Sequence, residues 1–258
     1  FENMKEEKIL VKELETNYKI GGKGENLLIL HGWNGSSDSW KKIIEILEIK
    51  FRIICPDFPG FGKTKPPKTP WNLDDFVGWL KEFTEKLNLE SFFLLGHSFG
   101  GRVAIKFSIL YPEKVKRLIL ISPAGIREDL GLKEKIIFQI SKIGNAIFSK
   151  NPLLRFKEGV RNLFYKLAMI KDYSKVKGVM KETMKKIIGE DLLPELPKIQ
   201  NETFIIWGEK DKIVPLKYAF IFKEKIKNSK LEILPKIGHS PHLEDPEKLA
   251  EILFSNLK

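Results

Sequence analysis

Residues 94–101 read LLGHSFGG and place one serine, Ser98, between two glycines directly after an apolar run. The residues that follow, 103–110, carry apolar side chains at helical spacing. The pattern Gly96-x-Ser98-x-Gly100 between a strand and a helix meets the structural condition for a nucleophile elbow, a sharp turn that exposes a hydroxyl at the carboxyl end of a sheet. The alternative is a serine that caps a helix in a glycine turn. We interpret Ser98 as the candidate nucleophile of an α/β protein.

Other short apolar runs rich in β-branched and aromatic residues have the length of buried strands. With 92–95 they are 27–30, 51–54, 118–121, 204–207 and 231–234. Segments with helical spacing lie between them, at 40–47, 76–87, 103–110, 219–226 and 249–253. This alternation predicts a mostly parallel sheet with helices on both faces, and a chain of 258 residues needs only one such domain.

The alternation fails between residues 121 and 203, where amphipathic helical patterns at 136–147, 160–168 and 176–187 (Val176, Met180, Met184 and Ile187) replace a single helix. An insertion of this length with its own helices is typical of a cap over a site. We therefore predict a helical cap at 126–198 and an α/β core at 1–125 and 199–258. Apolar residues of this insertion that either line the pocket or form the core of the cap are Phe138, Ile140, Phe148, Phe156, Phe164 and Met169.

The chain is strongly basic, with a net charge of +11, and residues 127–198 hold 16 Lys and Arg against 9 Asp and Glu. Only six of the 45 basic residues are arginine, the usual choice for phosphate recognition, and no run of five basic residues occurs. These features favour a lysine-rich solvated surface and no nucleic-acid partner. No apolar run approaches the roughly 20 residues of a membrane span. Cys55, the single cysteine, is typical of a reducing compartment, so we expect a cytoplasmic monomer or homodimer without stable membrane insertion.

A serine hydroxyl becomes an effective nucleophile only when a base takes its proton, so a partner histidine is needed. His239 lies in LPKIGHSPHLEDPE, the loop after the last predicted strand, and its position makes it the candidate base. His242 is the alternative base. His31 ends a strand and is expected to brace the adjoining loop, and His97 is expected to point elsewhere and to have a packing or polar role.

An acid must hold the imidazole in the correct tautomer. Asp211 in FIIWGEKDKIVP follows the penultimate predicted strand, which gives the order Ser98, Asp211, His239, and Glu209 is a substitute in the same loop. The spacing His239-x-x-His242 also occurs in metal sites, but no second ligand cluster accompanies it, and we expect no metal.

The oxyanion formed by attack on a carbonyl needs preorganised hydrogen-bond donors. The backbone N–H of Phe99, the residue after the nucleophile, is one candidate. The other is the N–H of Trp33 in HGWNG, the loop after strand 27–30, whose indole is then free to line the substrate pocket beside Phe99. The same loop also reads as a glycine turn leading to a helix capped by residues 36–38, and both readings can hold together.

Five stretches of the sequence resemble motifs of the α/β-hydrolase superfamily, and they follow one another in the same order as in that superfamily. They are LILHGWNGSSDSW, IICPDFPGFGKT, LLGHSFGGRVAIKFSILYPEKVKRLILISPAG, FIIWGEKDKIVP and IGHSPHLEDPEKLAEIL. The resemblance implies an eight-stranded sheet with the cap inserted after the sixth strand, and a triad of Ser98, Asp211 and His239. It also implies that the loop with Asp57, Pro59, Gly60 and Gly62 is structural.

The resemblance limits the classes of reaction that we expect this chain to catalyse. Haloalkane dehalogenases and epoxide hydrolases of this superfamily use an aspartate where this chain has Ser98. Its C–C hydrolases usually carry a more glycine-rich oxyanion loop and a tryptophan shortly after the catalytic histidine, and this chain has HGWNG and GHSPHLED. We therefore expect a cofactor-independent carboxylesterase acting on small esters with a mostly apolar acyl or alcohol group. C–C hydrolysis, thioester cleavage, acyl transfer, perhydrolysis and ligand sensing stay open as alternatives.

Overall fold

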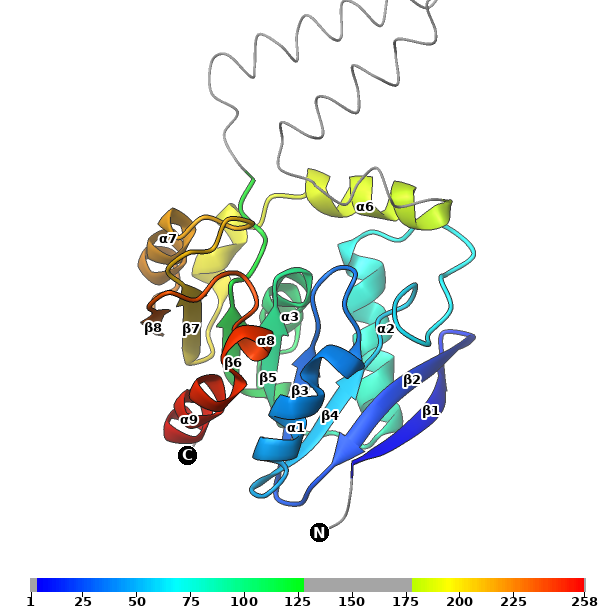
Figure 1. The fold of residues 1–258 in the computed structure, drawn as a ribbon. Helices are drawn as coiled ribbons and strands as arrows, with labels where there is room; N and C mark the ends of the chain where they lie inside the picture. Colours follow the sequence, from blue (N-terminus) through cyan, green and yellow to red (C-terminus); the bar gives the residue numbers. More distant parts are fainter. Residues whose placement is uncertain (1–3, 128–177, 258) are drawn as a thin grey trace, which may run out of the picture.

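The computed structural model describes residues 4–127 and 178–257 (Figure 1). One eight-stranded sheet runs through this part of the chain in the order β1-β2-β4-β3-β5-β6-β7-β8. The strands are β1 Lys5–Val11, β2 Leu14–Gly21, β3 Glu25–Leu30, β4 Phe51–Pro56, β5 Phe92–His97, β6 Val115–Ile121, β7 Thr203–Gly208 and β8 Ser229–Leu234. The pairs β1–β2 and β2–β4 are antiparallel and all others are parallel, which confirms the predicted fold class.

The two strands without an apolar run in the sequence are β1 and β2. They form a hairpin at the edge of the sheet, and β1 is exposed along most of its length. Lys12 and Glu13 connect them with φ values of 46° and 61°, the left-handed conformations that a tight two-residue hairpin turn requires. An edge strand with mostly polar residues carries little hydrophobic signal, so only pairing with β2 reveals it.

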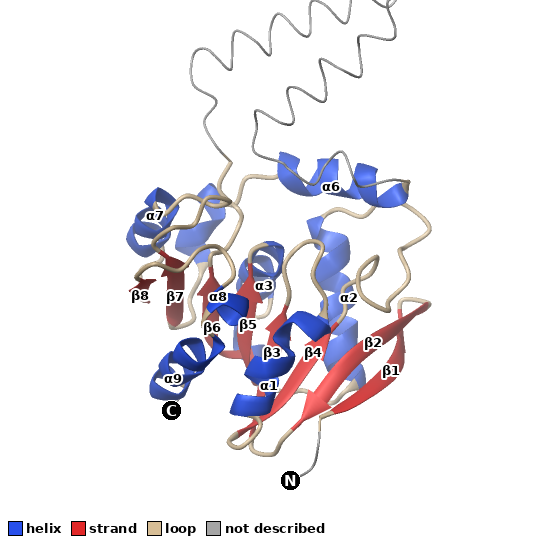
Figure 2. Cartoon of the chain, viewed as in Figure 1, coloured by secondary structure: helices blue, strands red, loops and turns tan. Residues whose placement is uncertain are grey.

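Strands β3 to β7 are largely buried on both faces because helices cover the sheet on both sides (Figure 2), whereas β8 at the other edge alternates between exposed and partly buried residues. One face is covered by α1 Lys41–Leu47 and α9 Pro246–Asn256, with the short α8 Pro241–Glu244 beside α9. The other is covered by α2 Leu73–Lys86, α3 Phe99–Leu110 and α7 Lys217–Lys225. The 3-10 turns are η1 Ser37–Trp40, η2 Pro112–Lys114 and η3 Leu193–Lys198.

Alternate strand residues enter two separate cores. In β3, Leu28 and Leu30 pack into the core beneath α2 and α3, whereas Leu27 and Ile29 pack into the core beneath α1 and α9. Burying each such side chain contributes about 1.5–3 kcal/mol. This double burial explains why the parallel strands appear in the sequence as continuous apolar runs.

Of the predicted cap, the structure describes residues 126–127 and 178–198. Helix α6 Val179–Gly189 confirms the helical pattern of Met180, Met184 and Ile187, all of which are buried. The patterns expected at 136–147 and 160–168 lie outside the described residues, as do Phe138, Ile140, Phe148, Phe156, Phe164 and Met169.

The C-terminal end of α6 is held on α3, the helix that follows Ser98. The guanidinium of Arg102 donates hydrogen bonds to the carbonyls of Ile187 (2.7 Å) and Glu190 (2.9 Å). Lys106, one turn further along α3, pairs with the carboxylate of Glu190 at 2.6 Å. Figure 1 shows α6 beyond the ends of β3 and β5, so these contacts join the base of the expected cap to the nucleophile region.

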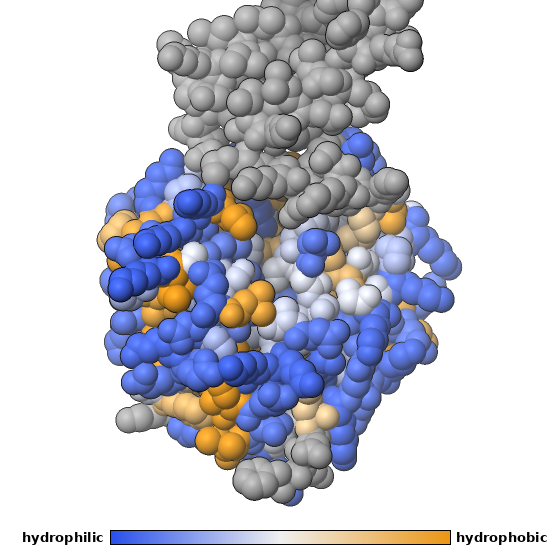
Figure 3. All heavy atoms as spheres, viewed as in Figure 1, coloured by the Kyte–Doolittle hydropathy of each residue, from blue (hydrophilic) through white to orange (hydrophobic). Residues whose placement is uncertain are grey.

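The surface is mostly hydrophilic, and on the face in Figure 3 apolar residues occur in small separate groups. The large apolar side chains exposed in the described part of the chain come from different elements: Leu10, Ile49, Leu110, Ile213, Phe220 and Leu243. Single exposed apolar residues are normal for a globular protein. No helix among residues 4–127 and 178–257 has the length and hydropathy needed to cross a membrane.

Candidate active site

Ser98 occupies the turn between β5 and α3 with φ 51° and ψ −112°, a conformation that non-glycine residues rarely adopt. Its N–H donates to the carbonyl of Ile121 at the end of β6 (3.1 Å), and its carbonyl accepts from the N–H groups of Gly101 and Ala124 (3.0 Å each). With a longer hydrogen bond from the N–H of Arg102 to the same carbonyl (3.4 Å), four main-chain hydrogen bonds hold the strained residue in place, while the serine itself stays partly exposed.

The two glycines of the elbow are required by close packing. A methyl group on Gly96 would lie 2.5 Å from the carbonyl oxygen of Gly100, and one on Gly100 would lie 2.3 Å from that of Leu30 in β3. Neither contact is compatible with a side chain. The Gly-x-Ser-x-Gly spacing is thus the steric condition for a turn this tight.

His239 and Asp211 form a buried pair. Nδ1 of His239 donates to Oδ2 of Asp211 at 2.8 Å, and Oδ1 of Asp211 accepts from the N–H groups of Ile213 (2.8 Å) and Val214 (2.9 Å). Burial raises the pKa of Asp211, but the hydrogen bond and charge of His239 and the two N–H groups outweigh it and hold this pKa below its ordinary value. The carboxylate is therefore ionised, and the proton on Nδ1 leaves Nε2 of His239 with a free lone pair.

Glu209, the substitute acid of the sequence analysis, does not face the imidazole. Its exposed carboxylate accepts from the N–H of Lys236 at 2.8 Å. The acid loop and the histidine loop nevertheless touch, since a methyl group on Gly208 would lie 1.9 Å from the carbonyl oxygen of Gly238. Of the two carboxylates in the acid loop, Asp211 is the one that this packing turns towards His239.

A second carboxylate holds the backbone on either side of His239. Glu244 in α8 accepts from the N–H of Gly238 (2.7 Å) and from the N–H of Ser240 (3.0 Å). Sequence reasoning missed this contact, although Glu244 lies only five residues beyond His239 in the same motif. The two hydrogen bonds fix the loop that carries the imidazole.

His97 has a polar role, as expected, and its polar contact is with His239 of the candidate site. Its buried ring lies 4.9 Å from that of His239, and its Nε2 is 2.8 Å from the main-chain oxygen of His239. Because His97 directly precedes Ser98, this contact brings the serine and the Asp211–His239 pair into one site.

His242, the alternative base, is buried away from solvent. Its ring stacks on Trp40 with centroids 4.2 Å apart and planes at 3°, and it meets the ring of His97 at 4.7 Å. Burial, together with the neighbouring His239, lowers the pKa of His242 to about 3. The geometry therefore favours His239 over His242 as the group that meets a substrate.

His31 braces two loops, as the sequence suggests. Its Nε2 accepts from the N–H of Phe58 at 3.0 Å, so its Nδ1 carries the proton and donates to the carbonyl of Gly32 at 2.8 Å. Burial lowers the pKa of His31 to about 4, which keeps the ring neutral. The HGWNG loop is thereby tied to the loop after β4.

The HGWNG loop packs directly on the elbow. A methyl group on Gly32 would lie 2.9 Å from Nδ1 of His97 and 3.3 Å from Cβ of Ser98. The rings of Trp33 and Phe99 meet edge to face at 5.3 Å. The two residues named as sources of oxyanion donors therefore lie side by side next to the serine.

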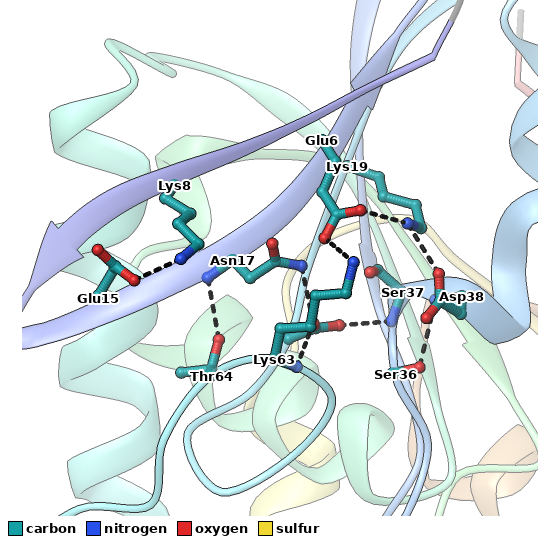
Figure 4. Close-up of polar contacts among 11 residues, drawn as sticks. Glu6, Lys8, Glu15, Asn17, Lys19, Ser36, Ser37, Asp38, Lys63 and Thr64 are labelled. Atoms are coloured by element: carbon teal, nitrogen blue, oxygen red, sulfur yellow. Dashed lines mark hydrogen bonds and ion pairs between the residues drawn. The ribbon is translucent and has the colours of Figure 1, made fainter.

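Asp57 fixes the backbone that directly follows the HGWNG loop. Its carboxylate accepts from the N–H of Ser37 (2.7 Å), the N–H of Lys63 (2.9 Å) and the side-chain amide of Asn17 (2.9 Å). Figure 4 shows Asn17, Ser37 and Lys63 converging here, and the N–H of Asn17 also donates to the hydroxyl of Thr64. The structural role expected for Asp57 agrees with these contacts.

The loop with Pro59, Gly60 and Gly62 closes around the same carboxylate. A methyl group on Gly62 would lie 2.3 Å from Oδ2 of Asp57, and one on Gly60 would lie 2.4 Å from Sδ of Met180 in α6. Both glycines have positive φ values, 90° for Gly60 and 54° for Gly62. They let the loop pass between Asp57 and the described end of the expected cap.

Replacing Asp57 with alanine is expected to lower the free energy of unfolding by about 3–5 kcal/mol, because two buried donors and one partly buried donor lose their acceptor. Urea unfolding measures this change. The matched control is Glu15→Ala, which removes an exposed carboxylate whose partner is the exposed Lys8 (2.6 Å) and should leave the free energy of unfolding nearly unchanged. Similar losses for both variants would contradict the role given to Asp57.

The neutral histidines predict a loss of stability in acid. In the unfolded chain, His31 and His242 take up a proton near pH 6.5, whereas their folded pKa values are about 4 and 3. The unfolded state therefore binds more protons below pH 6.5, and the free energy of unfolding falls as pH drops from there towards 4, by up to about 1.4 kcal/mol per pH unit for each ring. Urea unfolding at pH 7.5 and pH 5 should show a smaller loss for His242→Phe than for the wild type. An equal loss would show that His242 is not kept neutral.

A family model described as the alpha/beta hydrolase fold matches residues 25–142 and 178–246. The chain belongs to the α/β-hydrolase family. It is 29% identical over 256 residues to a 2-hydroxy-6-oxo-6-(2'-aminophenyl)hexa-2,4-dienoic acid hydrolase of Metapseudomonas resinovorans, covering 95% of this chain and 88% of that protein. It is 26% identical to the human monoacylglycerol lipase ABHD6, covering 92% and 76%. An esterase from Exiguobacterium antarcticum has a similar structure, with a TM-score of 0.74, 25% identity and coverage of 97% and 98%.

Proposed function

We propose that this hydrolase cleaves carboxylic esters with a mostly apolar acyl or alcohol group through an acyl-enzyme intermediate. Ser98 attacks the ester carbonyl while Nε2 of His239 takes its proton, and Asp211 holds the imidazole and stabilises its cationic form. The backbone N–H groups of Phe99 and Trp33 bind the oxyanion. Water activated by His239 then releases the acid.

The observation that carries the proposal is the Asp211–His239 hydrogen bond of 2.8 Å beside the strained Ser98 turn. It leaves a lone pair on Nε2, which is what a general base for a serine hydroxyl needs. The packing of the HGWNG loop against Ser98 supports the position of the oxyanion donors. In this proposal residues 126–198 form a cap that supplies much of the acyl pocket, and the enzyme acts in the cytoplasm.

Ester cleavage is favoured over other reactions by residue type. A serine nucleophile with a histidine base suits acyl transfer to water, and the rings of Trp33, Phe61 and Phe99 pack against one another next to the elbow. The esterase and monoacylglycerol lipase among the similar proteins support an ester substrate. Aromatic side chains of this kind bind apolar groups rather than charged ones.

The test is a panel of p-nitrophenyl esters of increasing acyl length, together with labelling by a fluorophosphonate. We expect turnover of at least the shorter esters, and labelling at Ser98, located by mass spectrometry of the peptides. Absence of both turnover and labelling would overturn the serine-hydrolase proposal.

A second candidate is hydrolysis of a C–C bond in a 2-hydroxy-6-oxo-dienoic acid, which the similarity to the Metapseudomonas resinovorans hydrolase favours. The sequences HGWNG and GHSPHLED argue against it, since they depart from the C–C hydrolase pattern. Loss of the yellow dienoate absorbance separates the two functions. Turnover of the dienoate with labelling of Ser98, but without ester turnover, would replace the ester substrate by a C–C substrate on the same residues.

A further inference from the structure

The side chain of His97 connects three parts of the site. It belongs to the residue before Ser98, its Nε2 lies 2.8 Å from the carbonyl oxygen of His239, and its Nδ1 edge packs against Gly32 of the HGWNG loop. The ring is buried, and the rings of His239 and His242 lie beside it with centroids 4.9 and 4.7 Å away. None of the catalytic roles proposed above uses this side chain.

The protonation state of His97 follows from its partners. A carbonyl oxygen only accepts hydrogen bonds. Nε2 of His97 therefore carries the proton and donates a hydrogen bond to the main-chain carbonyl of His239. Nδ1 is buried and has no hydrogen-bond partner among the described residues, as expected of the unprotonated nitrogen of a neutral ring. Burial and the neighbouring His242 and His239 lower the pKa of His97 well below its ordinary value.

We propose that His97 is a positioning residue for His239, and that its Nε2–H fixes the main chain of the base relative to the nucleophile. The inference rests on the proposed function of His239. Asp211 fixes the imidazole through its side chain, and Glu244 fixes the N–H groups of the flanking Gly238 and Ser240. The His97 hydrogen bond joins the base loop directly to the strand end that carries Ser98.

This link matters because proton transfer depends on the separation of the two groups. Ser98 and His239 lie on loops 141 residues apart in the chain. The Ser98 turn is held by Ile121 and Ala124, and the His239 loop is held by Glu244. The His97 hydrogen bond sets their relative position through one side chain and one peptide unit. Displacing a catalytic group by about 1 Å can cost on the order of 100-fold in rate.

A pair of substitutions isolates the hydrogen bond. In His97→Gln the amide nitrogen can reach the place of Nε2 and donate to the carbonyl of His239. In His97→Asn the shorter side chain puts its amide at the place of Nδ1, against Gly32, and leaves that carbonyl without this donor. Both residues are neutral and polar, so the pair differs mainly in where the donor lies.

We expect His97→Asn to lower kcat for the best p-nitrophenyl ester about 10- to 100-fold with little change in KM, and to slow fluorophosphonate labelling of Ser98 by a similar factor. His97→Gln should recover most of both rates. Circular dichroism and thermal melting of each variant establish that the measurements are made on folded protein. His242→Phe, which keeps a flat ring on Trp40 next to His97, should retain wild-type rates.

Equal kcat values for the glutamine and asparagine variants, both folded, would overturn the positioning role. The positioning role would also be overturned if the kcat of the asparagine variant returned to the wild-type value when the assay temperature was lowered well below its melting temperature, because the loss would then come from unfolding. Failure of the proposed function looks different, because the wild type itself would then show neither ester turnover nor labelling at Ser98.

Discussion

Replacing Ser98 with alanine is expected to lower kcat by about 10⁶-fold, because the residues of a nucleophile–base–acid set act as a unit and the nucleophile removes nearly all of their joint effect. Residual turnover of about 10³–10⁴ over water would come from binding and the oxyanion donors. The melting temperature should change little, since Ser98 is held by its main chain and not by its hydroxyl. Steady-state assays with the best ester of the panel, and thermal melting, measure the two quantities.

The matched control for this variant is Ser122→Ala. Ser122 also has a positive φ, 40°, and follows the adjacent strand β6, but its hydroxyl is buried and has no hydrogen-bond partner in the described part of the chain. Its removal should leave kcat near the wild-type value. Retained activity in Ser98→Ala would refute Ser98 as the nucleophile, whatever the control does.

Asp211→Asn is expected to lower kcat by about 10⁴-fold through the tautomer of the base. The amide oxygen can still accept from the N–H groups of Ile213 and Val214, which places the NH₂ group opposite His239. An NH₂ group donates, so Nδ1 must accept and the imidazole proton moves to Nε2. Nε2 then has no lone pair to take the proton of Ser98.

Glu209→Gln is the control for Asp211→Asn, because it makes the same change in the same loop on a carboxylate that faces Lys236. It should keep nearly all activity. A kcat loss below about ten-fold in Asp211→Asn, measured on folded protein, would show that Asp211 is not the acid partner. A large loss in Glu209→Gln would move that role to Glu209.

The fold could largely be predicted because its strands carry strong local signals. The six predicted strands correspond to β3 to β8, and burial of β3 to β7 on both faces demands continuous apolar runs. The apolar pattern missed the edge hairpin because β1 is mostly polar and exposed, and because β2 carries polar residues such as Asn17 and Lys19 even where it is buried. Helix α2 begins three residues before the predicted segment 76–87, where Asn72 and Asp75 form a capping box that the apolar pattern does not contain.

The sequence named the candidate residues of the site, but not the contacts that they make with one another. Position after a strand selected the loops of Ser98, Asp211 and His239, because the carboxyl ends of parallel strands meet at one edge of a sheet. In two of these loops the sequence offered a second candidate, Glu209 beside Asp211 and His242 beside His239. That choice depends on backbone paths, which the pattern of residues does not encode.

What the sequence by itself determined is the elbow, the alternation of strands and helices that places it and the resemblance to the family, because steric and periodic constraints act within a few residues of each other. What only the tertiary structure decided is which side chain meets which. It turned Asp211 rather than Glu209 towards His239, buried His242 on Trp40, and placed the ring of His97 on the carbonyl of His239. These outcomes required loops that are far apart in the chain to pack together, since hydrogen bonds and burial depend on distances in space.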